Sequence, residues 1–111
     1  MDHYEIWCDL RETSRDREFC ANVDSYLAHV QERGLLESWS LARRKLGFGV
    51  TGLGEFHITI DVRDMAQLEA LFQYVATRTG EVERLHAAVF SMVRNAQFSL
   101  YRDFPDQPRQ L

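Results

Sequence analysis

The segment Glu55–Val62 (EFHITIDV) decides the fold, because its apolar and polar residues alternate without a break. Successive side chains of a β-strand point to opposite faces of the sheet. One face, expected to be buried, therefore carries Phe56, Ile58, Ile60 and Val62. The other face carries Glu55, His57, Thr59 and Asp61. We expect a ligand, if the protein has one, to lie near His57.

Three other segments are predicted strands. Residues 4–10 and 96–101 alternate like the first segment, with Tyr, Ile, Cys and Leu on one face of the former. Residues 37–46 contain Trp39 and Leu41 at alternate positions, but the basic run 43–45 blurs the register. The faces of this strand are not assigned.

Helical spacing fills the remaining regions. Thr13 or Ser14 is expected to cap a first helix that ends at Gly34, with an apolar stripe formed by Phe19, Val23, Tyr26, Leu27 and Val30. Asp64, with Gln67 three residues later, predicts the start of a second helix. Its stripe is Met65, Leu68, Leu71, Phe72 and Val75, and a shorter helix after Gly80 carries Val82, Leu85, Val89 and Met92.

The resulting order, β-α-β-β-α-(α)-β, is typical of an α+β ferredoxin-like sandwich, whose four-stranded antiparallel sheet has helices on one face. We expect one domain over residues 1–104 and a tail over 105–111. The uncovered face would present Glu5, Trp7, Glu55, His57, Thr59, Gln97, Ser99 and Tyr101. This mixture is too aromatic for simple solvent exposure, so a second copy of the sheet is the expected cover.

Composition excludes several classes of function. The 111 residues are 45% hydrophobic, which suits one domain with a real core. A net charge of -4, from 13 basic and 17 acidic residues, argues against binding to nucleic acid. No apolar run is long enough to span a membrane, and no secretory leader is recognisable, so a cytoplasmic protein is expected.

Cys8 and Cys20 are the only cysteines, and both fall beside apolar stripes. We expect two buried, reduced thiols, with a disulfide between them as the less favoured alternative. The stretch Gly47–Gly52 matches G-x-G-x-x-G but precedes a strand, whereas a dinucleotide fingerprint must open a helix. Its glycines are expected to shape a turn, with an anion site beside the basic run as the alternative.

His57 is the strongest candidate for a catalytic group. A flanking carboxylate would fix its tautomer, so that the imidazole acts as a general base while Tyr101 or Gln97 donates a hydrogen bond to developing charge. The further candidate ligand contacts are Trp7, Glu55, Thr59, Gln97, Arg43 and Arg44. The alternative role for His57 is a structural hydrogen bond across a dimer interface. No metal site is expected, because no third ligand is fixed near Glu55 and His57.

The chain resembles the dimeric α+β-barrel superfamily, and within it a small bacterial family of uncharacterised proteins. The similarity lies in residues 4–7 (YEIW), 43–49 (RRKLGFG), 53–58 (LGEFHI) and 100–105 (LYRDFP). It implies a homodimer formed through the open sheet face, but it transfers no catalytic role. The haem-degrading pattern is not matched, since the first strand has no Asn. No cofactor is expected.

Two functions remain open on these observations. The first is a pocket for a small amphipathic molecule between the sheet and the partner subunit, as in a cofactor-free oxygenase or isomerase. The second is a non-enzymatic dimeric ligand-sensing or interaction module. The superfamily hosts many functions, so the fold alone does not choose between them.

Overall fold

The computed structural model describes residues 1–105, which form a four-stranded antiparallel sheet and three α-helices. The strands are β1 (Asp2–Leu10), β2 (Ser38–Arg43), β3 (Phe56–Val62) and β4 (Val93–Arg102), and the helices are α1 (Asp16–Glu32), α2 (Met65–Ala76) and α3 (Gly80–Phe90). The sheet order is β2-β3-β1-β4. This is the predicted α+β ferredoxin-like sandwich. The predicted tail, apart from Pro105, lies outside the described residues.

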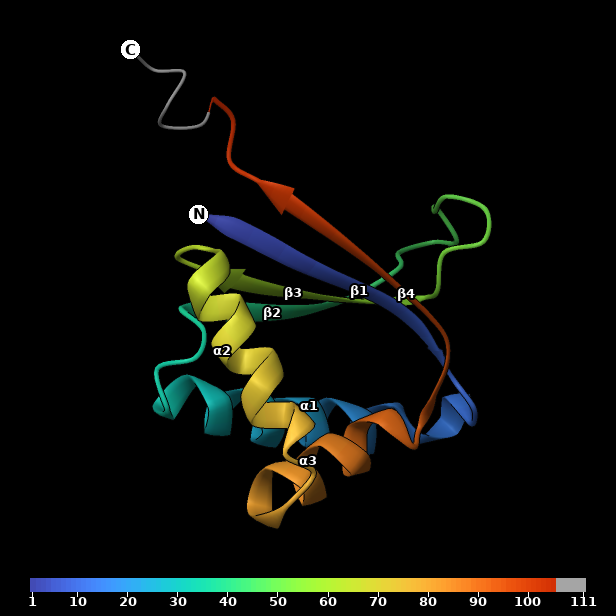
Figure 1. Cartoon of the computed structure of the whole chain (residues 1–111). Coiled ribbons are helices and arrows are strands. Elements are labelled where there is room, and N and C mark those ends of the chain that lie inside the picture. Colours follow the sequence, from blue (N-terminus) through green and yellow to red (C-terminus); the bar gives the residue numbers. More distant parts are fainter. Residues whose placement is uncertain (106–111) are drawn as a thin grey trace.

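All three helices lie on one side of the sheet (Figure 1). Helices α1 and α3 pack against each other, and α2 crosses beside them. The other side of the sheet is covered by no element of residues 1–105. In the same part of the chain, no helix has the length and apolar character needed to cross a membrane.

The core fills the space between the sheet and the helices. Ile58 and Ile60 of β3 are at most 4% exposed, as the alternation of Glu55–Val62 predicts. Phe19 and Leu27 of α1 and Leu68 of α2 are fully buried against them. Burying one such side chain stabilises a fold by about 1.5–3 kcal/mol.

The strand register defines the open face of the sheet. Trp7 pairs with His57 on one side and with Gln97 on the other. Glu5 pairs in the same way with Thr59 and Ser99, and His3 with Asp61 and Tyr101. Directly paired residues of neighbouring strands share a face. The predicted open-face residues of these three strands therefore lie together.

Strand β2 is shorter than the predicted strand 37–46, and its faces are now assigned. Trp39 pairs with Ile60 and Leu41 with Ile58, so both point toward the helices. The strand ends at Arg43, where the chain leaves the sheet for the loop of residues 44–54.

Strand β4 differs from its prediction in length and in burial. It begins at Val93 instead of residue 96, and its pairing with β1 shifts by a bulge between Trp7 and Asp9. Phe98 and Leu100 do face the helix side, because they pair with Ile6 and Tyr4. They are nevertheless 54% and 48% exposed, since the helices leave this edge strand largely uncovered.

The start of α1 corrects two further predictions. A 3-10 turn at Thr13–Arg15 precedes the helix, so the predicted cap residues Thr13 and Ser14 lie inside this turn. No side-chain hydrogen bond caps the start of the turn or the start of α1. Asp16 and Glu18 instead provide acidic charge in the first turn, which the helix dipole favours. Cys20 is exposed, whereas Cys8 is buried as predicted, and both are free thiols. Cys20 lies next to Phe19 in sequence, and a helix rotates neighbouring residues onto different faces.

The start of α2 follows its prediction. The Asp64 carboxylate accepts a hydrogen bond from the Gln67 backbone N–H. The buried Gln67 amide accepts from the Arg63 N–H and donates to the Gly34 carbonyl. Gly34, at φ 73°, ends α1 in the left-handed conformation that glycine adopts without strain. Gln67 thus ties the end of α1 to the start of α2.

Candidate functional site

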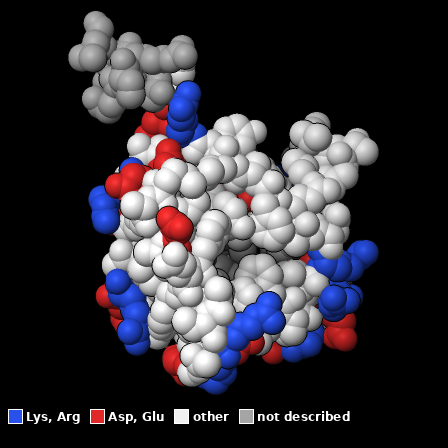
Figure 2. All heavy atoms as spheres, viewed as in Figure 1, with Lys and Arg blue, Asp and Glu red and all other residues white. Residues whose placement is uncertain are grey.

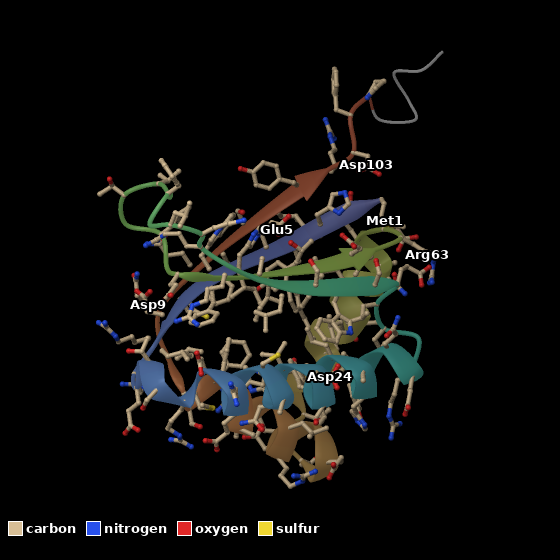
Figure 3. The ribbon with its side chains drawn as sticks, turned by 180° about the vertical axis from the view of Figure 1, so that it is seen from behind. Met1, Glu5, Asp9, Asp24, Arg63 and Asp103 are labelled. Atoms are coloured by element: carbon tan, nitrogen blue, oxygen red, sulfur yellow. The ribbon has the colours of Figure 1, made fainter. Side chains whose placement is uncertain are left out.

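The open face carries a connected group of side chains, Glu5, Trp7, His57 and Thr59, which we call the open-face cluster. Glu5 Oε2 lies 2.7 Å from His57 Nε2 and accepts a 2.6 Å hydrogen bond from Thr59 Oγ1. The His57 ring stacks on Trp7 with centroids 4.6 Å apart and planes 6° from parallel. Figure 3 shows Glu5 on β1, whose strand separates the cluster from α1. Cross-strand pairing between β1 and β3 brings the cluster together.

The hydrogen bond to Glu5 fixes the role of each imidazole nitrogen. An ionised carboxylate only accepts hydrogen bonds, so the proton of a neutral His57 lies on Nε2. Nδ1 makes no hydrogen bond within residues 1–105, and the His57 side chain is 35% exposed. Nδ1 is therefore left to accept a proton or a hydrogen bond from another molecule.

The carboxylate beside His57 comes from Glu5, whereas the sequence pointed to a flanking residue such as Glu55. The Glu55 carboxylate pairs instead with Arg43, at 2.6 Å. Arg43 also donates to Asp16 at 2.9 Å, and its guanidinium lies 5.0 Å from the centre of the Phe56 ring. Two carboxylates thus neutralise Arg43 at the edge of the sheet.

The two candidate residues of β4 share the face but lie outside the cluster. Gln97 is the register neighbour of Trp7, and Tyr101 is the neighbour of His3. Both side chains are exposed, and neither bonds to His57. Within residues 1–105, His57 contacts Trp7, Thr59 and Glu5 among the predicted site and open-face residues.

A groove lies between the open-face cluster and the loop of residues 44–54, and we call it the loop groove. Its volume is about 340 Å³. The lining includes Trp7, Arg43, Arg44, Glu55 and His57, together with Phe48, Val50 and Leu53 of the loop. Five of the predicted site residues therefore share one concavity.

Glycines let the loop fold this closely. A Cβ on Gly54 would lie 2.3 Å from the carbonyl carbon of Cys8, so only glycine fits against β1 there. A Cβ on Gly49 would meet the Arg44 side chain at 2.4 Å. Strand β3 follows the loop, so the G-x-G-x-x-G stretch opens no helix.

A second concavity lies on the opposite side of the sheet, between β1, β4, α2 and α3. We call it the helix-side cavity, and its volume is about 370 Å³. Its walls are mostly apolar and aromatic, formed by Tyr4, Ile6, Tyr26, Ile60, Leu71, Phe72, Val75, His86, Phe90 and Phe98. In Figure 2 the centre of the surface toward the viewer is hollowed and uncharged, and the charged groups lie around it.

The polar groups of the helix-side cavity have no hydrogen-bond partner within residues 1–105. These groups are the His86 imidazole and the hydroxyls of Tyr4 and Tyr26. The His86 ring stacks on Phe90 at 4.5 Å and meets the edge of Tyr26 at 5.6 Å. Burial lowers the pKa of His86 and raises the pKa of Tyr26. At neutral pH the imidazole is therefore an acceptor and the phenol a donor.

The sequence pattern predicts no ligand in this cavity. His86 flanks the apolar stripe of its helix, which favours a position at the edge of the core. The available signal was the i, i+4 pair of His86 and Phe90, which puts two flat rings on one helix face. Nothing in the spacing shows that Tyr4 and Phe98 face the same space.

Metal coordination has no support in the described part of the chain. Across residues 1–105, no three His, Cys, Asp or Glu side chains come together as ligands. The His29 ring is engaged elsewhere, since its Nε2 lies 2.8 Å from the Tyr74 hydroxyl.

Comparison with known proteins defines the class of the chain. The chain belongs to a family of unknown function, DUF6614, whose model matches residues 1–111. No curated protein matches it in sequence. Solved structures of dimeric ferredoxin-like proteins share its fold, in agreement with the resemblance to the α+β-barrel superfamily.

Three of the similar solved structures illustrate the low sequence identity. SnoaB of Streptomyces nogalater, a cofactor-independent oxygenase, has a TM-score of 0.69 and 9% identity over 97% of both chains. A dimeric ferredoxin-like protein of unknown function from Jannaschia sp. CCS1 has a TM-score of 0.68 and 9% identity over 92% of this chain and 98% of that one. A dimeric ferredoxin-like protein from an uncultured marine organism has a TM-score of 0.55 and 16% identity over 92% of this chain and 91% of that one. At these identities the similarity establishes the fold.

Proposed function

We propose that this protein binds one small, mostly apolar molecule containing an aromatic ring in the helix-side cavity. One observation carries the proposal: His86 and Tyr26 line an apolar cavity and have no hydrogen-bond partner within residues 1–105. The polar atoms of both side chains reach solvent, because neither is among the buried side-chain atoms that lack a partner in residues 1–105. A ligand with one polar group would take the place of water on them.

The shape and chemistry of the cavity narrow the ligand. Its volume of about 370 Å³ is at the small end of ligand pockets, which measure roughly 300–1,000 Å³. Phe72, Phe90 and Phe98 favour a flat ring through stacked or edge-on contacts. A phenol or an enol would donate to the neutral His86 and accept from Tyr26.

The same geometry supports proton-transfer chemistry without a cofactor. A neutral imidazole can accept the hydrogen bond of a bound phenol or enol and polarise its O–H bond as charge develops on the oxygen. The description of SnoaB as a cofactor-independent oxygenase supports this class of activity for a similar fold. The substrate stays open, because fold similarity transfers no specificity.

Thermal unfolding with a panel of phenols, naphthols and their methyl ethers tests the proposal. A ligand at ten times its Kd stabilises the fold by about 1.4 kcal/mol. We expect stabilisation of the wild type and of His57→Gln on the open face, and its loss in His86→Phe, which fills the cavity. If no compound stabilises the wild type, or if His86→Phe responds equally, the cavity is not the site.

The second candidate function, a dimeric ligand-sensing or interaction module, is favoured by a different observation. Polar groups of the open face pair with one another, as in the bonds of Glu5 to His57 and of Ser38 to Asp61. Burial of such a face under a second copy costs little free energy, because its polar groups already have hydrogen-bond partners. We therefore propose a homodimer through the open sheet face, supported by the dimeric descriptions of two neighbours. A cytoplasmic location remains a prediction.

A further inference from the structure

The loop groove combines a positive charge, an imidazole and an apolar wall in one concavity. Arg44 and His57 both line it, and Phe48, Val50 and Leu53 of the loop form apolar parts of the same lining. Phe48 and Val50 are 81% and 69% exposed, which is unusual for side chains of this type. The groove lies on the opposite side of the sheet from the helix-side cavity, so it is a separate site.

Arg44 differs from its neighbour Arg43 in its electrostatic pairing. Arg43 is held by the carboxylates of Glu55 and Asp16. Arg44 donates one hydrogen bond, to the carbonyl oxygen of Leu53, and forms no ion pair within residues 1–105. Asp9 acts on Arg44 only at longer range, so the guanidinium keeps donors free for an anion, and its planar fork matches a carboxylate.

Gly49 contributes to the position of Arg44. Its missing side chain leaves the space through which the Arg44 guanidinium passes, since a Cβ there would lie 2.4 Å from Arg44 Nε. The loop thus holds the cation in place by close contact with its backbone.

His57 supplies the second polar contact of the groove. Glu5 holds Nε2, and the stack on Trp7 fixes the ring plane, which leaves Nδ1 without a partner in the described residues. In the neutral ring Nδ1 can accept a hydrogen bond, whereas Arg44 donates the hydrogen bonds that a carboxylate needs.

We propose that the loop groove binds a small carboxylate with an apolar body. The carboxylate contacts Arg44, and the apolar body packs against the Phe48, Val50 and Leu53 side chains. This site is independent of the aromatic ligand proposed for the helix-side cavity. It extends the predicted ligand contacts Trp7, Arg43 and Arg44 to a defined class of ligand.

Trp7 fluorescence provides the test, because the ring lines the groove. The Trp39→Phe background leaves Trp7 as the only tryptophan. The probes are benzoate, phenylacetate, hexanoate and octanoate, with phenylacetamide as the uncharged match for phenylacetate. We expect a saturable change of Trp7 emission with at least one carboxylate, and binding of phenylacetamide at least tenfold weaker than that of phenylacetate if phenylacetate is a binder.

Substitutions of Arg44 test whether this side chain binds the carboxylate. Arg44→Gln should weaken carboxylate binding about tenfold or more, since a charge-assisted hydrogen bond contributes about 1.5–3 kcal/mol. Arg44→Lys should retain part of the affinity. Arg17→Gln, which removes an exposed arginine of α1 outside the groove, is the matched control and should bind like the background protein.

Two results would overturn the proposal. One is the absence of any Trp7 response to all four carboxylates at 10 mM, a concentration at which even a Kd of about 1 mM gives near-saturation. The other is a response that Arg44→Gln leaves unchanged but His86→Phe abolishes, which would place the carboxylate in the helix-side cavity. Loss of phenol binding alone, with the carboxylate response intact, would reject the cavity proposal and leave this one standing. Far-ultraviolet circular dichroism of each variant verifies folding.

Discussion

His3 and Asp61 face each other across β1 and β3, with His3 Nδ1 2.6 Å from Asp61 Oδ1. The other ring nitrogen lies 2.6 Å from Asp103 Oδ1, just beyond the end of β4. One imidazole therefore joins β1, β3 and the chain that follows β4, at the rim of the open face.

This bridge predicts a pH-dependent stability. Hydrogen bonds to Asp103 and Asp61 raise the pKa of His3 above 6.5. The protonated form thus contributes stability that is complete below about pH 6.5. This contribution is lost as the pH rises through the raised pKa of the folded state. Because Asp103 is exposed, we expect at most about 1 kcal/mol.

Urea unfolding of the wild type and His3→Gln at pH 5.5 and pH 8.5 measures this effect. The substitution should cost more at the lower pH. Equal costs at both pH values would show that protonation of His3 does not stabilise the fold.

Gly54→Ala should destabilise the protein by more than about 2 kcal/mol, because the new Cβ would overlap the Cys8 backbone in the centre of the sheet. Gly49→Ala is the matched control. The three atoms nearest to its Cβ all belong to the Arg44 side chain, which can move. Urea unfolding should give a lower midpoint for Gly54→Ala than for Gly49→Ala. Similar midpoints would argue against the close approach of Gly54 to β1.

Gln67→Met should destabilise the protein by about 2–3 kcal/mol, because the Arg63 N–H and the Gly34 carbonyl lose their partner. Methionine keeps a similar volume, so packing changes little. Gln73→Met, at an exposed position of the same helix, should stay within about 0.5 kcal/mol of the wild type. An equal effect at both positions would mean that the Gln67 bonds contribute nothing.

Cys20 should react with iodoacetamide in the native protein, and Cys8 should not. Cys8 is 1% exposed, and burial raises the pKa of its thiol to about 11. Reactivity requires an accessible thiolate. Mass spectrometry should find one label on the native chain and two in denaturant. A native chain labelled at Cys8 would contradict the packing of β1.

The open sheet face should form the dimer interface. Thr59→Arg places a charge in the centre of this face and should shift sedimentation from dimer to monomer, because an unpaired charge at an interface core is costly. Ser25→Arg, on the exposed side of α1, is the control and should remain dimeric. A monomeric wild type at micromolar concentration would remove the proposed interface.

The alternation of Glu55–Val62 was sufficient to predict both faces of the central sheet, since a period of two leaves a strand one choice of buried face. The same argument failed for Phe98 and Leu100. Their side of the sheet was predicted, but their exposure depends on how far α2 and α3 extend over β4. The position of these helices over β4 is set by tertiary packing, which the local sequence pattern does not encode.

The sequence predicted on which face of the sheet His57 lies, but it did not predict which carboxylate bonds to it. His57 was expected beside a carboxylate, but the choice of Glu5 over Glu55 follows from the register of β1 against β3. The helix-side cavity is harder still to predict, because Tyr4, Phe98 and His86 come from three elements whose packing no local pattern encodes.

Strand β1 has a consequence for how this protein can change. Its odd-numbered residues face the loop groove, where Trp7 lines the wall and Glu5 holds His57, while the even-numbered Tyr4 and Ile6 line the helix-side cavity. A single-residue insertion before residue 4 that shifted the strand register would exchange these sets, placing a carboxylate in the apolar cavity and a tyrosine on the polar face. Both sites therefore depend on one register of β1, so a change in the length of this strand would disrupt the two together.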